Sequence, residues 1–232
     1  MAFSALFFTL INAGPLFIEG AYYTVVTTCT AMVIGIVGGL LGGLVTCKQL
    51  KNNYISPFVS FYVFIIRGTP VYVQVLIIYF VIPEIIGVSL SPCVAGVIAL
   101  GCNSIAYVSE IVRGGLNTIP VGQWEACAVL GYSQVHAVKS IIVPQMFKNV
   151  LPSMVNELIV LLKETSILSM IGCVEITRVS MNISARTLDP VSSYGASALL
   201  YLTLTSILWV FTKKIEKEFT YDCSIKPNTY NK

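Results

Sequence analysis

Three stretches of this chain contain no charged residue, and each is long enough to cross a lipid bilayer as an α-helix. They comprise residues 20–47, 85–109 and 190–212, and each exceeds the roughly 20 residues that a membrane-spanning helix requires. Charged residues make up only 11% of the chain, against about 25% in ordinary soluble domains. The sequence therefore predicts an all-α, polytopic membrane protein.

Two further spans are expected between these three. Residues 68–83 are short for a span, and the apolar residues 58–66 that precede them would complete it. Residues 150–174 are long enough but contain Glu157, Lys163 and Glu164, charges that lipid disfavours. The prediction is about five transmembrane helices.

Lysine and arginine are concentrated in alternate loops, which predicts the orientation of the chain because basic loops stay in the cytoplasm. They lie between spans one and two, between spans three and four, and after span five (Lys48, Lys51, Arg67; Arg113, Lys139, Lys148; Lys213, Lys214, Lys217). We expect the N-terminus outside and the C-terminus in the cytoplasm. The expected division is an interfacial segment at 1–17, a membrane domain at 18–219 with a cytoplasmic loop at about 114–148, and a cytoplasmic tail at 220–232.

Several kinds of site are not expected. The seven cysteines form no CxxC pair and are interpreted as small core residues, and the single histidine, His136, has no partner for a metal. We expect no cofactor, no nucleic-acid partner and no catalytic residues. The chain has no phosphate-binding loop, so any ATP hydrolysis requires a separate subunit. Five spans are few for a transport pathway, which favours a second copy or a paralogue.

The cytoplasmic loop is expected to form an elbow of two short helices. Pro120 suits the first turn of a helix and Gly131 suits its left-handed end. Ser133 would cap a second helix that Pro144 ends, with Tyr132 between the two. Such an elbow could lie on the membrane surface, anchored by Trp124, or it could dock a cytoplasmic partner.

The spacing within this loop favours docking. Glu125, Ala126 and Cys127 are followed by Gly131, then by Ile141 and, three residues later, by Pro144. This is the pattern Glu-Ala-Ala-x3-Gly-x9-Ile-x-Leu-Pro with cysteine and valine substituted at two positions.

The pattern resembles the "EAA" loop in membrane subunits of ATP-binding-cassette (ABC) importers. The segments RGTPVYVQ (67–74), AYVSEIVRGGLNTIPVGQWEA (106–126), VPQ (143–145), NELIVLLKETSIL (156–168) and EITR (175–178) are similar to the polar amino-acid branch of that family. The resemblance implies a type I ABC importer fold. It also implies that Glu125, Ala126 and Gly131 shape a coupling helix and that the ATPase contacts the following turn (Tyr132, Ser133, Gln134, His136).

The charged fourth span is a candidate substrate site. Glu157 and Glu164 are seven residues apart, which places them on one helix face at about 3.6 residues per turn. Two acids beside the single Lys163 would favour a cationic ligand, although a structural ion pair is the alternative.

Polar residues on spans two and three could complete this site. Pro70 lacks an N–H and frees the carbonyl four residues earlier, which indicates irregular backbone near a cavity or simply the start of span two. Asn103 and Tyr107 could equally hold helices together. The resemblance implies that a central cavity is lined by these residues together with the two acids (Gly68, Thr69, Pro70, Gln74, Asn103, Ser104, Tyr107, Glu157, Glu164).

The predicted function is the permease subunit of a bacterial inner-membrane ABC importer for polar, basic amino acids: arginine, lysine or histidine. Implied partners are two ATP-binding subunits, a second permease, an extracytoplasmic amino-acid-binding protein, the amino acid and membrane lipid. An ion-coupled carrier or channel that relays cations through Glu157 and Glu164 is the alternative. A membrane-embedded enzyme ranks third because no nucleophile and base are recognisable.

Overall fold

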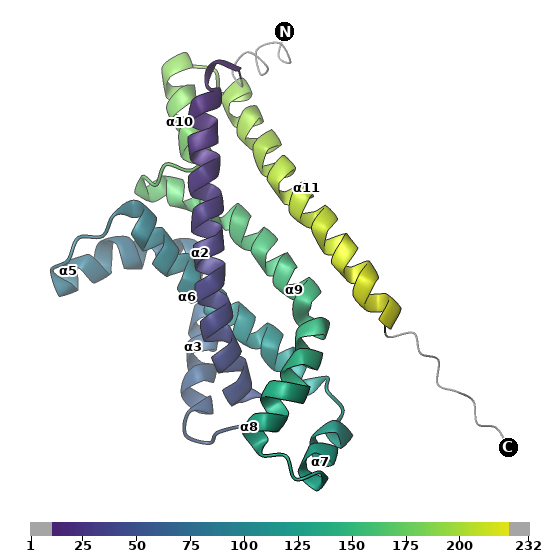
Figure 1. The fold of residues 1–232 in the computed structure, drawn as a ribbon. Helices are drawn as coiled ribbons and strands as arrows, with labels where there is room; N and C mark the ends of the chain where they lie inside the picture. Colours follow the sequence, from purple (N-terminus) through teal and green to yellow (C-terminus); the bar gives the residue numbers. More distant parts are fainter. Residues whose placement is uncertain (1–10, 223–232) are drawn as a thin grey trace.

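The computed structural model describes residues 11–222, with side chains as far as residue 214, and this part of the chain is helical without a strand (Figure 1). The elements are α2 (Gly14–Thr46), α3 (Ser56–Gly68), α4 (Val71–Leu76), the π-helical turn η1 (Ile77–Val81), α5 (Ile82–Ile86), α6 (Pro92–Asn117), α7 (Val121–Val129), α8 (Gln134–Ala137), the π-helical turn η2 (Val138–Ile142), α9 (Val143–Glu164), the 3-10 helix η3 (Thr165–Ile171), α10 (Ile176–Thr187) and α11 (Pro190–Asp222).

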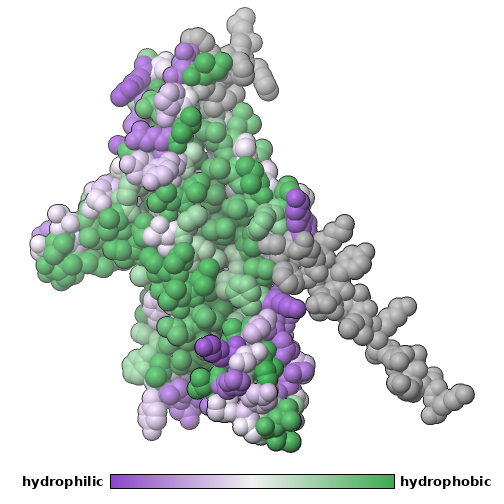
Figure 2. All heavy atoms as spheres, viewed as in Figure 1, coloured by the Kyte–Doolittle hydropathy of each residue, from purple (hydrophilic) through white to green (hydrophobic). Residues whose placement is uncertain are grey.

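Within residues 11–222, three helices are long and apolar enough to span a membrane: α2, α6 and α11 as far as Lys214. Figure 2 shows apolar residues across the middle of the molecule and polar residues gathered above and below. Helix α2 begins at Gly14 with proline in its first turn, so residues 14–17 of the expected interfacial segment continue into the first span. Residues 1–10 of that segment and 223–232 of the tail lie outside the described residues.

The second expected span is broken. Helix α3 meets the helical run Val71–Ile86 at 104°, and only as one bent pair would the two count as a fourth span. Residues 58–66 therefore precede this span in a separate helix and do not extend it in line. The break falls at Thr69 and Pro70, whose backbones are extended, because proline removes an N–H and disfavours helix in the residue before it.

Two expected helix boundaries are wrong. The third span begins at Pro92, since Gly87 ends α5 in the left-handed conformation and separates residues 85–86 from α6. Pro144 does not end the helix that Ser133 caps, because helical residues continue from α8 through η2 into α9. Pro144 is the second residue of α9 and directly follows the π-helical turn η2. Helix α9 carries four charged residues and is not among the helices apolar enough to span (Lys148, Glu157, Lys163, Glu164).

Helices α2 and α6 pack along a seam of small residues. A Cβ atom added at Gly39 would lie 2.5 Å from the Cβ of Val108 and 2.9 Å from the backbone nitrogen of Ser109. Gly35 and Gly43 make equally close approaches to Ser104 and Val112. Small residues let helix backbones approach closely in lipid. This seam therefore fixes the position of α6 against α2 and leaves the opposite face of α6 for other contacts.

Candidate functional site

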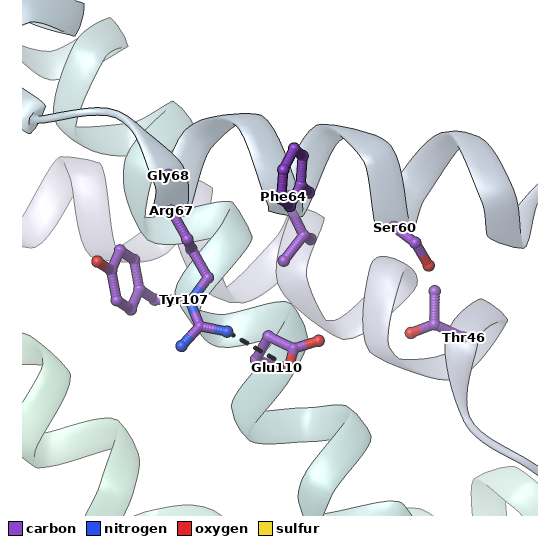
Figure 3. A pocket seen from close by; sticks show the side chains of 8 residues that line it. Thr46, Ser60, Phe64, Arg67, Gly68, Tyr107 and Glu110 are labelled. Carbon is purple, nitrogen blue, oxygen red and sulfur yellow. Dashed lines mark ion pairs between the residues drawn. The ribbon is translucent and has the colours of Figure 1, made fainter.

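An ion cluster lies where the C-terminal end of α3 meets α6 (Figure 3). The Arg67 guanidinium is 3.4 Å from the Glu110 carboxylate, and Arg113 donates two hydrogen bonds to that carboxylate at 2.8 and 2.7 Å. Arg67 also lies over the ring of Tyr107, at 5.2 Å from its centroid. Glu110 was not predicted as a site residue. Its signal in the sequence is a carboxylate three residues before Arg113, in a helix that has no other charged residue.

Two cavities meet at Tyr107. The first has a volume of about 430 Å³ and is lined by α3, α6 and the last residue of α2 (Thr46, Ser60, Val63, Phe64, Arg67, Gly68, Tyr107, Glu110). The second has a volume of about 530 Å³ and lies between α6, α9 and α11 (Tyr107, Ile111, Pro152, Ser153, Asn156, Glu157, Ile159, Trp209, Thr212, Lys213). Tyr107 belongs to both linings.

Glu157 supplies a buried carboxyl group to the second cavity. It is 7% exposed, and it lies within electrostatic range of the Arg67 guanidinium and the Glu164 carboxylate. Of the predicted substrate residues, the structure thus brings Gly68, Tyr107 and Glu157 together around the two cavities. Glu164 is half-buried at the last residue of α9 and lines neither cavity.

The side chain of Gln74 holds the break between α3 and α4 together. Its amide Nε2 donates to the carbonyl of Ile66 at 2.7 Å and to the hydroxyl of Thr69 at 2.9 Å, and Asn103 donates to its Oε1 at 3.1 Å. The prediction that Pro70 frees the carbonyl four residues earlier is confirmed, since that carbonyl belongs to Ile66 and accepts from Gln74. Gln74 and Asn103 are buried and line neither cavity, whereas Thr69 and Pro70 are exposed at the break.

Ser104 lies away from both cavities. It is fully buried in the α2–α6 seam, where its hydroxyl lies beside Gly35 and 4.0 Å from the sulfur of Met32. The structure thus places Ser104 on the face of α6 that packs against α2, whereas Asn103 and Tyr107 lie on a neighbouring face of the helix.

The elbow forms as expected in its first half. Gly131 has a φ of +77°, and α7 closes with hydrogen bonds from Gly131 to the Ala128 carbonyl at 3.1 Å and from Tyr132 to the Cys127 carbonyl at 3.0 Å. The Ser133 hydroxyl accepts from the backbone N–H of His136 at 3.4 Å and caps α8. Only glycine adopts the Gly131 conformation without steric cost, so this residue sets the angle of the turn.

The predicted coupling residues are all exposed on this elbow (Glu125, Ala126, Gly131, Tyr132, Ser133, Gln134, His136). The rings of Tyr132 and His136 stack at a centroid distance of 5.2 Å. Beside them, Val129 is 87%, Leu130 73% and Val135 78% exposed.

The inner face of the elbow packs on the protein itself. Cys127 is buried, and Trp124 packs against the hydrophobic cluster that contains Leu116 and Met146. The interpretation that the elbow lies on lipid required Trp124 as its anchor, and that side chain is turned inward. The exposed tip of the elbow is formed by Val129, Leu130 and Val135.

The described residues include no group of three or more His, Cys, Asp or Glu side chains that could hold a metal ion. Glu157, the Arg67–Glu110 pair and Tyr107 are among the charged and aromatic side chains that line the two cavities.

Comparison with known proteins agrees with this architecture. The chain is 41% identical over 201 residues to GlnP of Rickettsia typhi, named for a glutamine transport system, covering 87% of this chain and 91% of that protein. It is 36% identical over 207 residues to the arginine transport system permease protein ArtQ of Bacillus subtilis, covering 88% and 92%. A crystal structure of an amino acid ABC transporter with histidines aligns with a TM-score of 0.83 and 36% identity, over 91% of this chain and 98% of that one. Residues 31–219 match the family described as binding-protein-dependent transport system inner membrane component, and the chain belongs to that family of inner-membrane permeases.

Proposed function

We propose that this chain is the permease subunit of an ABC importer that carries basic amino acids into the cytoplasm, with ATP hydrolysed by a separate subunit. The observation that carries the proposal is the nearly buried Glu157 in a cavity of about 530 Å³ next to Tyr107. A buried ionisable group facing a cavity within a membrane protein is a functional-site hypothesis by default. Relatives named for arginine and for glutamine transport support an amino acid as the substrate.

The charges around the cavities suggest how such a substrate would be held. Glu157, with Glu164 in electrostatic range, would bind the guanidinium or ammonium group of the side chain. Arg67 and the exposed backbone at Gly68 and Thr69 would bind the α-carboxylate, since arginine pairs well with carboxylates. Gln74 and Asn103 would act by holding the break in place, and Ser104 by holding α6 against α2.

The elbow would be the coupling element. In this proposal two permeases, identical or paralogous, form the pathway, and the exposed surface from Glu125 to His136 of each seats in a groove of one ATPase subunit. Closure of the two ATPases would bring the elbows together and turn the cavities outward, where an amino-acid-binding protein delivers substrate. The elbow and the basic loops would then face the cytoplasm, with the N-terminus outside.

The substrate proposal is tested by uptake in reconstituted vesicles. With the chain, its ATPase and its binding protein present, labelled arginine, lysine, histidine and glutamine are compared. We expect Glu157→Gln to reduce uptake of the cationic amino acids at least about tenfold more than uptake of glutamine, which is a difference of about 1.4 kcal/mol. Glu84→Gln, which removes an exposed acid from α5 outside both cavities, is the matched control.

Two outcomes contradict this proposal. An equal reduction for glutamine and for arginine would show that Glu157 does not select charge. ATP-independent uptake driven by an ion gradient, without any ATPase subunit, would favour the ion-coupled carrier.

The docking proposal is tested at the turn of the elbow. Gly131→Val introduces a β-branched residue at positive φ, which is a strained conformation, whereas Gly131→Asn keeps a residue that tolerates it. We expect the valine variant to insert in the membrane yet to lose co-purification with the ATPase, and the asparagine variant to keep most of it. Retention of full ATPase binding and uptake by the valine variant would rule out a coupling role for the turn.

A further inference from the structure

Two cysteines that are 80 residues apart in sequence meet at one end of α6. The sulfur atoms of Cys93 and Cys173 are 2.7 Å apart. Cys93 is the second residue of α6, and Cys173 follows η3 directly after Gly172, whose φ of +91° turns the chain. The sequence had suggested only that these residues are small core side chains, and their pairing is a property of the tertiary structure.

Both sulfur atoms are held by ordered segments. Cys173 is 1% exposed and belongs to the hydrophobic cluster that contains Leu168, and its backbone N–H donates to the Leu168 carbonyl at 3.1 Å. Its own carbonyl accepts from Glu175 at 3.0 Å. Cys93 packs against the same cluster within the first turn of α6, which Ser91 caps. The two sulfurs need to approach by less than about 1 Å to reach disulfide bond length.

The other described cysteines lack this arrangement. Cys29 is exposed, Cys102 is half-buried, and Cys47 and Cys127 are buried at separate places. Within residues 11–222, Cys93 and Cys173 form the one pair of cysteine sulfurs in hydrogen-bonding contact. The unpaired cysteines serve as internal controls.

We propose that Cys93 and Cys173 form a reversible disulfide when the protein meets an oxidised thiol–disulfide oxidoreductase or a small-molecule disulfide. The thiolate of Cys93, the more exposed of the two, attacks one sulfur of the oxidant and releases its other sulfur as a thiol. The thiolate of Cys173 then attacks the Cys93 sulfur, closes the intramolecular bond and releases the second thiol of the oxidant. The protein gives up two protons and two electrons, and the oxidant's disulfide accepts them.

The position of the pair fits an oxidising environment. Cys93 and the elbow lie at opposite ends of α6, and the helical rise from Cys93 to Asn117 is about 36 Å at about 1.5 Å per residue, which is enough to cross a membrane. With the elbow in the cytoplasm the pair faces the extracytoplasmic side, where disulfides persist. This placement rests on the proposed function, whereas the contact between the two thiols does not.

The disulfide would join α6, which lines both cavities, to the segment that follows α9, which lines the second cavity. Helix α6 provides Tyr107, and η3 continues directly from α9, which provides Glu157. A disulfide would hold the start of α6 and the end of η3 at their present separation.

The test is chemical and needs no transport assay. The full-length chain in lipid nanodiscs is treated with oxidised glutathione or with reductant, free thiols are alkylated, and peptides are mapped by mass spectrometry. We expect oxidation to remove two alkylatable thiols of the seven and to yield a peptide linking positions 93 and 173 that reductant abolishes. Cys93→Ser and Cys173→Ser should each abolish that linked peptide, while Cys29→Ser and Cys102→Ser keep it.

Alkylation of both thiols after oxidation, or linkage mainly between chains or to another cysteine, would overturn the proposal. The wild-type peptide map decides the matter even if a serine variant fails to fold. Loss of this disulfide would leave the transport proposal intact, and failure of the transport proposal would leave the mapped disulfide intact.

Discussion

The two faces of α6 are built from different chemistry. The face toward α2 carries Ser104, Val108 and Val112, which fit against glycines so closely that an added methyl group has no room. The face toward the cavities carries Tyr107 and Glu110, which line the first cavity and both contact Arg67 of α3. The first face positions the helix by contact, and the second keeps charged and aromatic groups accessible. Stability and transport should therefore depend on different residues of the same helix.

The largest effect on stability is expected in the seam. Gly39→Ala places a Cβ atom against Val108 and the backbone of Ser109, and such overpacking lowers the free energy of unfolding by about 1–3 kcal/mol. Gly114→Ala is the matched control, because a Cβ there meets nothing within 4 Å and should raise stability by about 0.5–1 kcal/mol. Thermal unfolding in detergent measures the stability of both variants. Equal melting temperatures for Gly39→Ala and Gly114→Ala would contradict the packing role of the seam.

A smaller effect on stability, with a clear effect on transport, is expected on the cavity face. Glu110→Gln removes the partner of Arg67 and Arg113, and partly exposed ion pairs contribute only about 0–1 kcal/mol. Without that carboxylate the first cavity becomes more positive, so arginine uptake should fall several-fold while glutamine uptake changes less. Ser60→Ala, in the same cavity lining, is the uncharged control. A melting temperature lowered as far as that of Gly39→Ala would show that this face also positions the helix.

The smallest effect is expected outside both faces, at the start of α11. Asp189 accepts a hydrogen bond from the Ser192 backbone at 3.1 Å, and its hydrogen bonds to Ser192 lower the pKa of this exposed carboxyl below its usual value of 3.8. A lowered pKa in the folded state stabilises the fold above pH 3.8 and loses this contribution as the pH falls through the folded-state pKa.

Asp189→Ala should therefore lower the melting temperature slightly at pH 7 and have less effect below pH 3.8. Asp189→Asn keeps an acceptor for the cap but does not titrate, so it should remove the pH dependence and retain most of the stability. Melting curves across this pH range test the prediction. An effect as large as that in the seam would mean that α11 is positioned by its cap as firmly as α6 is by its glycines.

Much of this organisation was predictable from local patterns. The three charge-free stretches correspond to α2, α6 and α11, because the length and polarity of a segment decide whether lipid accepts it. Gly131 ends α7 and Ser133 caps α8 as expected, since both depend on the conformational preferences of single residues.

Predictions that required neighbouring elements were less successful. Pro144 was expected to end a helix, but the π-helical turn before it lets the chain continue in one helical run. The 104° bend between α3 and α4 depends on how Gln74 replaces the missing backbone hydrogen bond. Glu110 was missed because its partner Arg67 is 43 positions away in sequence and meets it only across two helices.

The sequence alone determined the class of protein, the positions of three spans, the elbow and the family, because each depends on composition or on motifs within one segment. The tertiary structure alone decided which polar residues share a cavity, which of them serve packing, and that Cys93 and Cys173 meet. The physical reason is that the residues sharing one face of a helix are set by their spacing within that segment. Which partner each face packs against depends instead on contacts between distant segments, here the glycine seam that orients α6.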